Sequence, residues 1–354
     1  MKQFRKIGVL TSGGDAPGMN AAIRAVTRTA LAHGVEVIGI YRGYSGLIAK
    51  DVKELGLRDV SNMINHGGTV LYSDRCPEFK TEEGMQKAIR SCEELGIAGI
   101  VAIGGDGTFR GASDLSVRGI PCIGIPGTID NDVTSTEHTI GFDTAMNTTL
   151  ELIDRLRDTC ESHARCNVVE VMGRNAGDIA AYTALTSGAT AVVLPEIPFD
   201  EDKLLEKIRH SRKLGKRNFI IVVSEGMGSE YGPALTERIE KETGVESRFA
   251  RFAHVVRGGI PTQKDRMLGT RMGEYAVEQL LLGKSNLVIC ERESELVATD
   301  IAFALAMDRM YKNKLKEGDL EPYSMEQIDE MKAVCEKKRK LITAICASVD
   351  KLGL

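Results

Sequence analysis

Three glycine-rich segments that contain acidic residues each follow a short apolar run. They are residues 11–20 (TSGGDAPGMN), 103–108 (IGGDGT) and 126–132 (PGTIDND). Glycine lets the backbone approach a phosphate closely, and a helix start offers N–H groups to an anion. Any one segment could be a tight turn of the fold, but three at the ends of three predicted strands favour a phosphate-binding site.

Carboxylates within these segments have spacings that suit phosphoryl chemistry. Asp106 lies inside a glycine turn, where its carboxylate can meet Mg²⁺ or the water on it. Asp130 and Asp132 are two residues apart, so an extended segment places both on one side. Such a pair suits a general base beside a metal-associated partner, and the alternative is an Asx-type turn.

Arginines supply what an anionic substrate requires. A guanidinium group binds phosphate at two points and neutralises charge on a transferring phosphoryl group. For each arginine alone a structural salt bridge is the alternative; the candidates are Arg75, Arg165, Arg174, Arg248 and Arg257, with His254 between the last two. No G-x-G-x-x-G fingerprint is present. Gly283-Lys-Ser resembles the end of a P-loop, but Glu278 stands where the first glycine of a P-loop would be.

The elements that must position these residues follow from the apolar runs. Apolar β-branched runs, each followed by a segment of helical periodicity, predict an α/β fold of mainly parallel strands with helical crossovers. Ligands bind beyond the carboxyl ends of such strands. The predicted strands are residues 7–10, 35–40, 100–103, 122–125, 168–171, 191–194, 219–223 and 287–290.

Two long segments have a helical apolar stripe, one starting at Phe142 and one covering residues 324–354. Lys337-Lys-Arg-Lys340 in the second is interpreted as a solvated helix face and not as a nucleic-acid-binding tail.

Length and composition limit the remaining classes. The 354 residues suggest two domains, and a net charge of −4 gives no general attraction to nucleic acid or to an acidic membrane. The N-terminal apolar run is too short for a signal peptide, and no run is long enough to span a membrane. The eight cysteines are scattered and read as reduced thiols. We therefore expect a cytoplasmic protein with no nucleic-acid or membrane partner.

The motifs together resemble the bacterial ATP-dependent 6-phosphofructokinases, from Ile7 to about Tyr323. Besides the three glycine-rich segments, the strings that carry the resemblance are MINHGGT (63–69), IDRLRD (153–158), VEVMGR (169–174) and IEKETG (239–244). The resemblance implies two Rossmann-like three-layer α/β domains with mainly parallel sheets and the active site in the cleft between them.

The resemblance also implies discontinuous domains. Residues 1–141 plus 256–306 would bind ATP, and residues 142–255 plus 307–323 would bind fructose 6-phosphate. Residues 324–354 extend past the usual end of the family as a helical extension. We expect this extension to be an added packing or interface element, whose removal leaves catalysis intact.

The implied reaction transfers the γ-phosphoryl group of MgATP to the 1-hydroxyl of fructose 6-phosphate, the committed step of glycolysis. Asp130 matches the general base, Thr128 contacts the phosphoryl group, Asp132 lies near the metal and Arg174 stabilises the transition state. Asp106 associates with Mg²⁺. The other ATP-contacting positions are Gly14, Tyr44, Arg75, Cys76, Gly105, Gly107 and Thr108.

Fructose 6-phosphate would be bound by Met172, Gly173, Glu225, His254 and Arg257, together with Thr128, Asp130 and Arg174. Arg165 and Arg248 would reach in from a neighbouring subunit of a homotetramer. Pyrophosphate-dependent relatives carry an Asp and a Lys where this chain has Gly107 and Gly127, so the resemblance predicts ATP as the donor.

A family effector pocket for ADP or phosphoenolpyruvate is only partly matched. Arg24, Arg28, Arg157 and Lys216 match its basic residues. Leu57 replaces an Arg, Asn62 an Asp, Thr190 a Glu and Leu214 a Lys. We expect weakened or altered regulation.

Three other functions are alternatives to this one. The first is a pyrophosphate-dependent or other sugar-phosphate kinase, and the second is a non-catalytic nucleotide-sensing subunit. The third is a dinucleotide-dependent oxidoreductase, which the absence of a G-x-G-x-x-G fingerprint disfavours.

Overall fold

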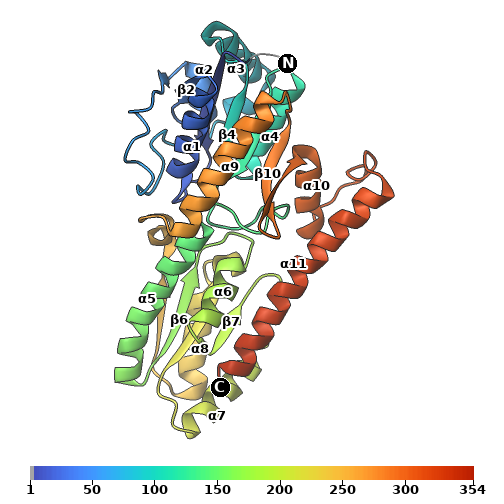
Figure 1. Ribbon diagram of the computed structural model, residues 1–354. Coiled ribbons are helices and arrows are strands. Elements are labelled where there is room, and N and C mark those ends of the chain that lie inside the picture. Colours follow the sequence, from blue (N-terminus) through green and yellow to red (C-terminus); the bar gives the residue numbers. More distant parts are fainter. Residues whose placement is uncertain (1–3) are drawn as a thin grey trace. The chain divides into compact units, whose positions relative to one another are not determined.

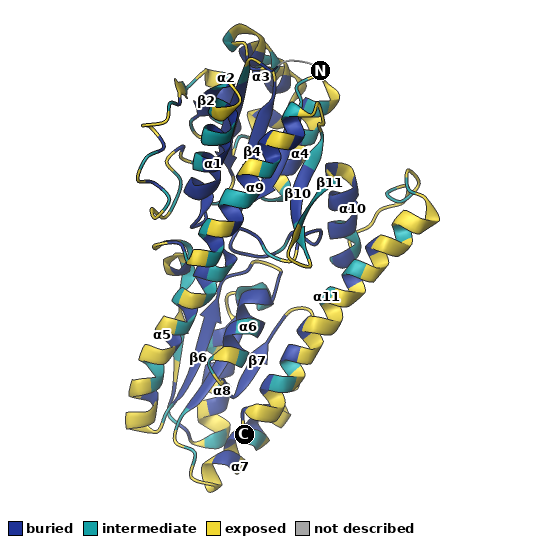
Figure 2. Ribbon diagram, viewed as in Figure 1, coloured by how far each residue is buried: buried dark blue, intermediate teal, exposed yellow. Residues whose placement is uncertain are grey.

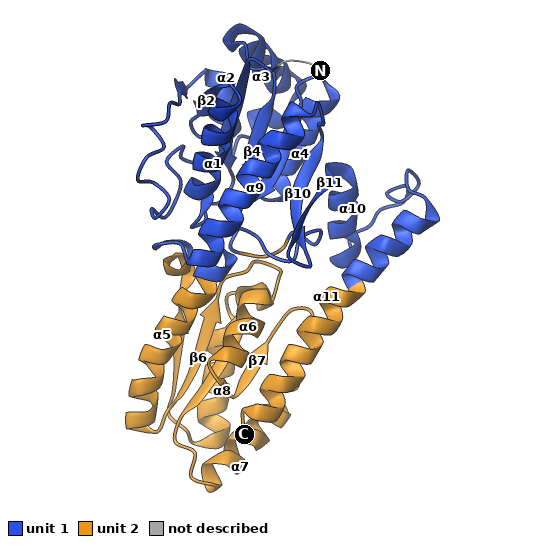
Figure 3. Cartoon of the chain, viewed as in Figure 1, with its two compact units in different colours: residues 1–129, 133–144, 257–335 blue, residues 130–132, 145–256, 336–354 orange. Residues whose placement is uncertain are grey.

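The computed structural model of the chain describes residues 4–354 and contains two compact units (Figure 3). Unit 1 comprises Met1–Ile129, Val133–Thr144 and Arg257–Cys335. Unit 2 comprises Asp130–Asp132, Ala145–Val256 and Glu336–Leu354. Each unit is therefore assembled from segments that are far apart in the sequence, and each is described by itself.

Unit 1 is built on a seven-stranded sheet with the strand order β11-β10-β5-β4-β1-β2-β3. The edge strands β3 and β11 are antiparallel to their neighbours, and the other pairs are parallel. The strands are β1 (Lys6–Ser12), β2 (Glu36–Ile40), β3 (Val52–Glu54), β4 (Ile100–Gly104), β5 (Cys122–Pro126), β10 (Leu287–Arg292) and β11 (Glu295–Asp300). The central strands are buried along their length (Figure 2), as parallel strands with both faces covered must be.

The helices of unit 1 are α1 (Met19–Ala32), α2 (Gly43–Ala49), α3 (Glu82–Leu95), α4 (Asp106–Val117), α9 (Gln263–Leu281) and α10 (Ile301–Tyr311), with a short 3₁₀ turn at Glu78–Lys80. Thr81 and Thr262 cap α3 and α9 through their side chains. Helices α1 and α9 lie side by side (Figure 1). Gly273 permits this approach, because a Cβ there would lie 2.7 Å from the carbonyl oxygen of Ala22.

Unit 2 is built on a four-stranded parallel sheet with the order β7-β8-β6-β9. Its strands are β6 (Cys166–Val171), β7 (Ala191–Val193), β8 (Phe219–Ser224) and β9 (Ser247–Arg251). Its helices are α5 (Phe142–His163), which begins in unit 1, and α6 (Asp178–Thr186), α7 (Glu201–Lys213) and α8 (Tyr231–Thr243), with 3₁₀ turns at Glu225–Met227 and Ala253–Arg257. Apolar residues of β6, β8, α7 and α8 form its core.

The C-terminal segment is one helix, α11 (Met325–Leu352), as the apolar stripe predicts. Its residues up to Cys335 belong to unit 1, where Met331 and Cys335 pack against Phe303 and Met307. Its residues from Glu336 onward belong to unit 2. The extension therefore does not form a body of its own.

The compact units differ from the expected domains in four places. Residues 130–132 and 256 lie in unit 2 and residues 142–144 in unit 1, each opposite to the expectation. Residues 307–323 are expected in the second domain, but the structure places them in unit 1. The reason is packing, because Met307 and Tyr311 on α10 belong to the same apolar cluster as Phe303 and Met331.

The α/β prediction is confirmed, and every one of the eight predicted runs is a strand. The strands that the prediction missed are β3, β9 and β11, all of which lie at sheet edges. These three edge strands carry polar, partly exposed residues, so they lack the continuous apolar run that marks the predicted strands.

The eight cysteines form no disulfide, and six of them are buried. Burial raises the pKa of Cys92 to about 12, so this thiol stays protonated. None of the helices in residues 4–354 has the length and apolar character needed to cross a bilayer.

Candidate active site

The first two glycine-rich segments meet at the carboxyl ends of two neighbouring central strands in unit 1. Strands β1 and β4 are parallel neighbours with Ser12 opposite Gly104, so the segments that follow them lie together. Thr108 Oγ1 donates a hydrogen bond to the Ser12 carbonyl at 3.0 Å, and the Tyr44 hydroxyl donates to the Thr108 carbonyl at 2.6 Å. Burial raises the pKa of Tyr44 well above its usual value, which keeps this hydroxyl protonated. The structure thus brings Tyr44, Thr108 and the start of α4 together.

Two further predicted ATP-contacting residues, Arg75 and Cys76, lie in the segment that follows Asp74. The backbone N–H of Gly13 donates to the Asp74 carbonyl at 3.4 Å, which ties that segment to the first glycine-rich segment. Cys76 is partly buried against the apolar core of unit 1, and Arg75 is exposed.

The glycines of these segments divide into two groups. A Cβ at Gly14 would lie 1.9 Å from Arg257 Nη2, and a Cβ at Gly127 would lie 2.9 Å from Met19 Cε. Both positions are crowded, but the nearest atoms are the ends of the flexible Arg257 and Met19 side chains, which can shift. A Cβ at Gly105 or Gly107 would meet nothing within 4 Å, and neither residue has a positive φ. The fold gives no reason for glycine at these two positions, so the space above them is open to a ligand.

This division refines the donor argument. Gly107 keeps its value as an indicator of a nucleotide, because a side chain there would project into open space. Gly127 is crowded by the side chains of Met19 and Ile103, so it says less about the donor than Gly107 does.

Asp106, the first residue of α4, contacts α10 and the loop after it. Lys312 Nζ lies 3.6 Å from Asp106 Oδ2. Asp308 on α10 is buried and accepts a hydrogen bond from the backbone N–H of Thr134 at 2.5 Å. Burial, together with the negative charge of Asp106, raises the pKa of Asp308 well above its usual value. Asp308 and Lys312 were not among the predicted residues, because about 200 residues separate them from Asp106 and no motif marks them.

Asp130 and Arg174 form the centre of the site residues in unit 2. The Asp130 side chain is 2% exposed, and its Oδ2 lies 3.3 Å from Arg174 Nε. Arg174 follows β6 in a turn with φ of 139° at Gly173 and 54° at Arg174. A left-handed conformation at a non-glycine residue costs about 1–3 kcal/mol and needs support from its surroundings.

Glu225 provides that support. Its Oε1 accepts hydrogen bonds from the backbone N–H groups of Gly173 at 3.1 Å and Arg174 at 2.7 Å. Strands β6 and β8 pair with Val171 opposite Ser224, so the residues that follow both strands meet at one edge. The structure therefore brings together Asp130, Gly173, Arg174 and Glu225, with Met172 at the same strand end.

The remaining predicted substrate residues are separated into two groups. Arg165 and Arg248 converge on Glu246 in unit 2: Arg165 Nη2 lies 2.9 Å from Glu246 Oε1, and Arg248 also pairs with this carboxylate. Arg257 belongs to unit 1, where its Nη2 donates to the carbonyl of Asp15 at 3.1 Å. His254 lies in the 3₁₀ turn that leads to Arg257.

Thr128 and Asp132 flank Asp130 in the chain. Thr128 belongs to unit 1, and its carbonyl accepts a hydrogen bond from Thr139 Oγ1 at 2.6 Å. Asp132 belongs to unit 2 and is partly exposed.

Three of the effector-type basic residues, Arg28, Arg157 and Lys216, donate hydrogen bonds within the chain. Arg28 Nη2 donates to the Leu57 carbonyl at 3.5 Å in unit 1, where Arg24 lies one turn earlier on α1. Arg157 donates to the Asn218 side chain at 3.0 Å and to the Ser187 carbonyl. Lys216 Nζ donates to the carbonyl of Gly353, just beyond α11, at 2.7 Å.

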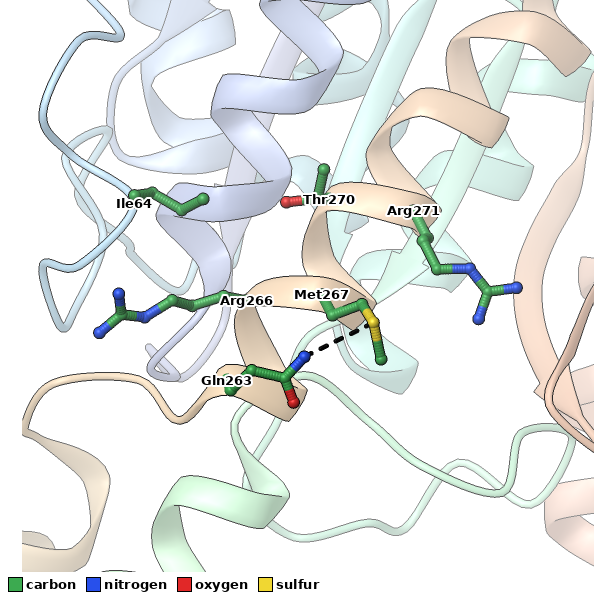
Figure 4. Close-up of a pocket in the computed structure, with 6 residues that line it drawn as sticks. All are labelled: Ile64, Gln263, Arg266, Met267, Thr270 and Arg271. Atoms are coloured by element: carbon green, nitrogen blue, oxygen red, sulfur yellow. Dashed lines mark hydrogen bonds between the residues drawn. The ribbon is translucent and has the colours of Figure 1, made fainter.

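A pocket of about 500 Å³ lies along α9 in unit 1 (Figure 4). The guanidinium groups of Arg266 and Arg271 point away from each other at its two sides. None of the predicted site residues lines it; its lining is Ile64, Gln263, Arg266, Met267, Thr270 and Arg271.

Known proteins place this arrangement in a family. Residues 6–280 match the family model described as Phosphofructokinase. The chain is 52% identical over 298 residues to a Bacillus pumilus protein named ATP-dependent 6-phosphofructokinase, covering 84% of this chain and 93% of the relative. It is also 52% identical over 314 residues to the protein of that name from Clostridium tetani, covering 89% of this chain and 98% of the relative.

Solved structures agree with the sequence relatives. The phosphofructokinase structure from Saccharomyces cerevisiae matches with a TM-score of 0.82 at 30% identity over 93% of this chain, which spans 50% of the yeast chain. A pyrophosphate-dependent phosphofructokinase from Marinobacter aquaeolei matches with a TM-score of 0.73 at 26% identity, covering 84% of this chain and 83% of that chain. This chain belongs to the phosphofructokinase family.

Proposed function

We propose that this chain is an ATP-dependent 6-phosphofructokinase, which phosphorylates the 1-hydroxyl of fructose 6-phosphate to give fructose 1,6-bisphosphate and ADP in glycolysis. The names of relatives at about 50% identity support this activity. The observation that carries it is the buried Asp130 carboxylate against Arg174, in a turn that Glu225 holds.

In the proposed reaction Asp130 accepts the proton of the sugar 1-hydroxyl. Arg174 lies against this buried carboxylate before the transfer and neutralises charge on the phosphoryl group during it. Thr128, two residues earlier, would contact the transferring phosphoryl group. Catalysis of in-line phosphoryl transfer depends mainly on the positioning of the reacting groups. The turn that Glu225 fixes would hold Arg174 in position for this reaction.

The nucleotide would lie over the start of α4, where Gly105 and Gly107 leave open space. Helix α4 presents its N-terminal end there, which favours phosphate oxygens. Gly14, Tyr44, Arg75, Cys76 and Thr108 complete the proposed ATP-contacting set.

The residues present fit a magnesium ion held jointly with the nucleotide. Asp106 Oδ1 is buried and, apart from the neighbouring Asp308 carboxyl, meets no hydrogen-bond donor among residues 4–354, so it is available to a cation. No three His, Cys, Asp or Glu residues in the described part of the chain form a metal cage, and Mg²⁺ is commonly held by one or two carboxylates plus substrate phosphates. Asp106 would hold the ion, with Asp132 near it; when bound, Mg²⁺ neutralises charge on the phosphates.

Fructose 6-phosphate would be bound by Met172, Gly173, Glu225, His254 and Arg257. Arg165 and Arg248 would bind its 6-phosphate across a subunit boundary of a homotetramer. Glu246 holds both guanidinium groups in this chain, so binding of the phosphate exchanges one anionic partner for another. The tetramer and a cytoplasmic location stay predictions from the resemblance.

A coupled assay with fructose 6-phosphate tests the proposal by comparing ATP with pyrophosphate. We expect ATP to be the donor, with pyrophosphate giving no rate above that of Asp130→Ser, the background control. Equal rates with the two donors would contradict the ATP assignment, and no rate with either would contradict the proposed function.

The same assay tests the open space above Gly107. We expect Gly107→Asp to raise the KM for ATP by at least about tenfold, since a carboxylate near phosphates at 4 Å opposes binding by about 4 kcal/mol before screening. Gly107→Ala is the control: it adds a Cβ without charge, and the structure leaves room for it. A full loss of folded protein in either variant would contradict the open space.

Regulation by ADP or phosphoenolpyruvate is proposed to be weak. Lys216 donates to the Gly353 carbonyl, and Lys207 Nζ donates to the Asp350 carbonyl at 2.6 Å, so the end of the chain engages these lysines. Burial lowers the pKa of Lys216. Thr190, in the position of an acidic residue, is buried beside Gly353.

We expect the rate to depend hyperbolically on the fructose 6-phosphate concentration. ADP or phosphoenolpyruvate should change the half-saturating concentration of fructose 6-phosphate by less than about fivefold, below the usual range of allosteric coupling. Steady-state titrations at fixed ATP measure this. Strong activation by ADP with sigmoidal kinetics would refute it.

A further inference from the structure

A lysine of the C-terminal helix contacts the segment that carries Asp130. Lys338 Nζ on α11 donates a hydrogen bond to the carbonyl of Asn131 at 2.7 Å. The same Nζ lies 3.3 Å from Oδ1 of Asp178, the first residue of α6. Asn131 Nδ2 donates to that same Oδ1 at 3.1 Å. Lys338, Asn131 and Asp178 thus form one triad within unit 2.

The triad is buried, unlike the neighbouring lysines of α11. The side chain of Lys338 is 14% exposed and that of Asp178 is 3% exposed, whereas Lys340 is 75% exposed and pairs with Glu336. The interpretation of residues 337–340 as a solvated helix face is therefore wrong for Lys338. Burying an amine and a carboxylate is costly unless they are paired, so this pair must form for α11 to pack here.

Asn131 is the residue whose geometry the triad controls. It has a left-handed φ of 51° and lies between Asp130 and Asp132. Asparagine tolerates this conformation better than most residues, but the orientation of its peptide still needs fixing. The Lys338 bond holds the Asn131 carbonyl and the Asp178 bond holds its side chain, so two contacts set the direction in which Asp130 and Asp132 leave the turn.

We propose that Lys338 is a positioning residue for phosphoryl transfer, which acts through Asn131 to hold the Asp130 carboxylate in register with Arg174. The proposal rests on the function proposed above. It reverses the expectation that residues 324–354 are dispensable for catalysis. Positioning errors of about 1 Å cost roughly 100-fold in rate, so the effect belongs in kcat.

The test compares Lys338→Met with Lys340→Met, a matched control on the same helix. We expect Lys338→Met to lower kcat by about 10- to 100-fold while the KM values for ATP and fructose 6-phosphate change less than about threefold. Lys338→Arg keeps the charge and the donor and should recover kcat to within about fivefold of the wild type. Lys340→Met should match the wild type.

A second variant separates positioning from charge balance. In Lys338→Met/Asp178→Asn both charges of the pair are removed together, so the melting temperature should return toward that of the wild type. The hydrogen bond from Lys338 to the Asn131 carbonyl is still missing, so kcat should stay at least about tenfold low. This variant also carries the test if Lys338→Met alone does not fold.

The outcomes are distinct. Wild-type kcat in Lys338→Met, or recovery of kcat together with stability in the double variant, would overturn the positioning role and leave the proposed function intact. An equal loss in Lys340→Met would also overturn it. A wild-type chain without activity on ATP and fructose 6-phosphate would overturn the proposed function and, with it, this inference.

Discussion

Asp130→Asn is expected to lower kcat by about 10³-fold, in the middle of the range for loss of a general base. Asparagine keeps the size of the side chain and can still lie against Arg174, but its amide cannot accept the proton of the sugar hydroxyl. The KM for ATP should change little, because the proposed nucleotide contacts lie in unit 1 and Asp130 lies in unit 2. Steady-state kinetics of ADP formation with fructose 6-phosphate measure both constants.

Asp158→Asn is the matched control, since it removes an exposed carboxylate on α5. It should leave kcat and both KM values unchanged. If Asp130→Asn retained more than about a tenth of the wild-type kcat, Asp130 would not be the general base.

Arg174→Lys should cost about 10²- to 10³-fold in kcat. Lysine keeps the positive charge and pays the same backbone cost in the left-handed turn, but it has no planar fork and no Nε to face Asp130. The charge that remains should keep the protein folded, so the loss reports on geometry at the phosphoryl group. Thermal unfolding beside steady-state kinetics separates the two effects.

Arg155→Lys serves as the control here, because Arg155 is 72% exposed and pairs across one helical turn with Glu151. The variant Asp130→Asn/Arg174→Lys gives a further check. Since the two residues act as one unit, its loss in kcat should be well below the product of the single losses. Multiplicative losses would mean that Asp130 and Arg174 act independently.

The central strands of both sheets could be predicted from the sequence because burial on both faces demands continuous apolar runs. Residues 100–103 and 219–223 show this pattern in its plainest form, and they became β4 and β8. The edge strand β9 is partly exposed and has two arginines in five residues, so it has no apolar run from which a strand could be predicted. The assignment of residues 307–323 failed for a different reason: the packing of Tyr311 near Met331 is a long-range choice that no local pattern encodes.

Much of the site could also be predicted, since local motifs position Asp130, Arg174 and the start of α4. The structure adds what local patterns do not contain. Glu225 was predicted as a substrate residue, and its observed contacts are with the backbone of Gly173 and Arg174. Asp178, Asp308, Lys312 and Lys338 were missed altogether, because their partners are between 47 and 207 residues away in the chain.

The buried Asp178–Lys338 pair also constrains the order in which this chain can change. Lys338 lies outside the residues 6–280 that the family model matches, and Asp178 lies inside them. Loss of Lys338 first would leave a carboxylate buried in the protein interior, whereas loss of the Asp178 charge first would leave an amine on a long flexible stem that can turn toward water. The effect of a substitution at one site therefore depends on the residue at the other. Loss of the Asp178 charge is tolerated better as the first step than loss of Lys338.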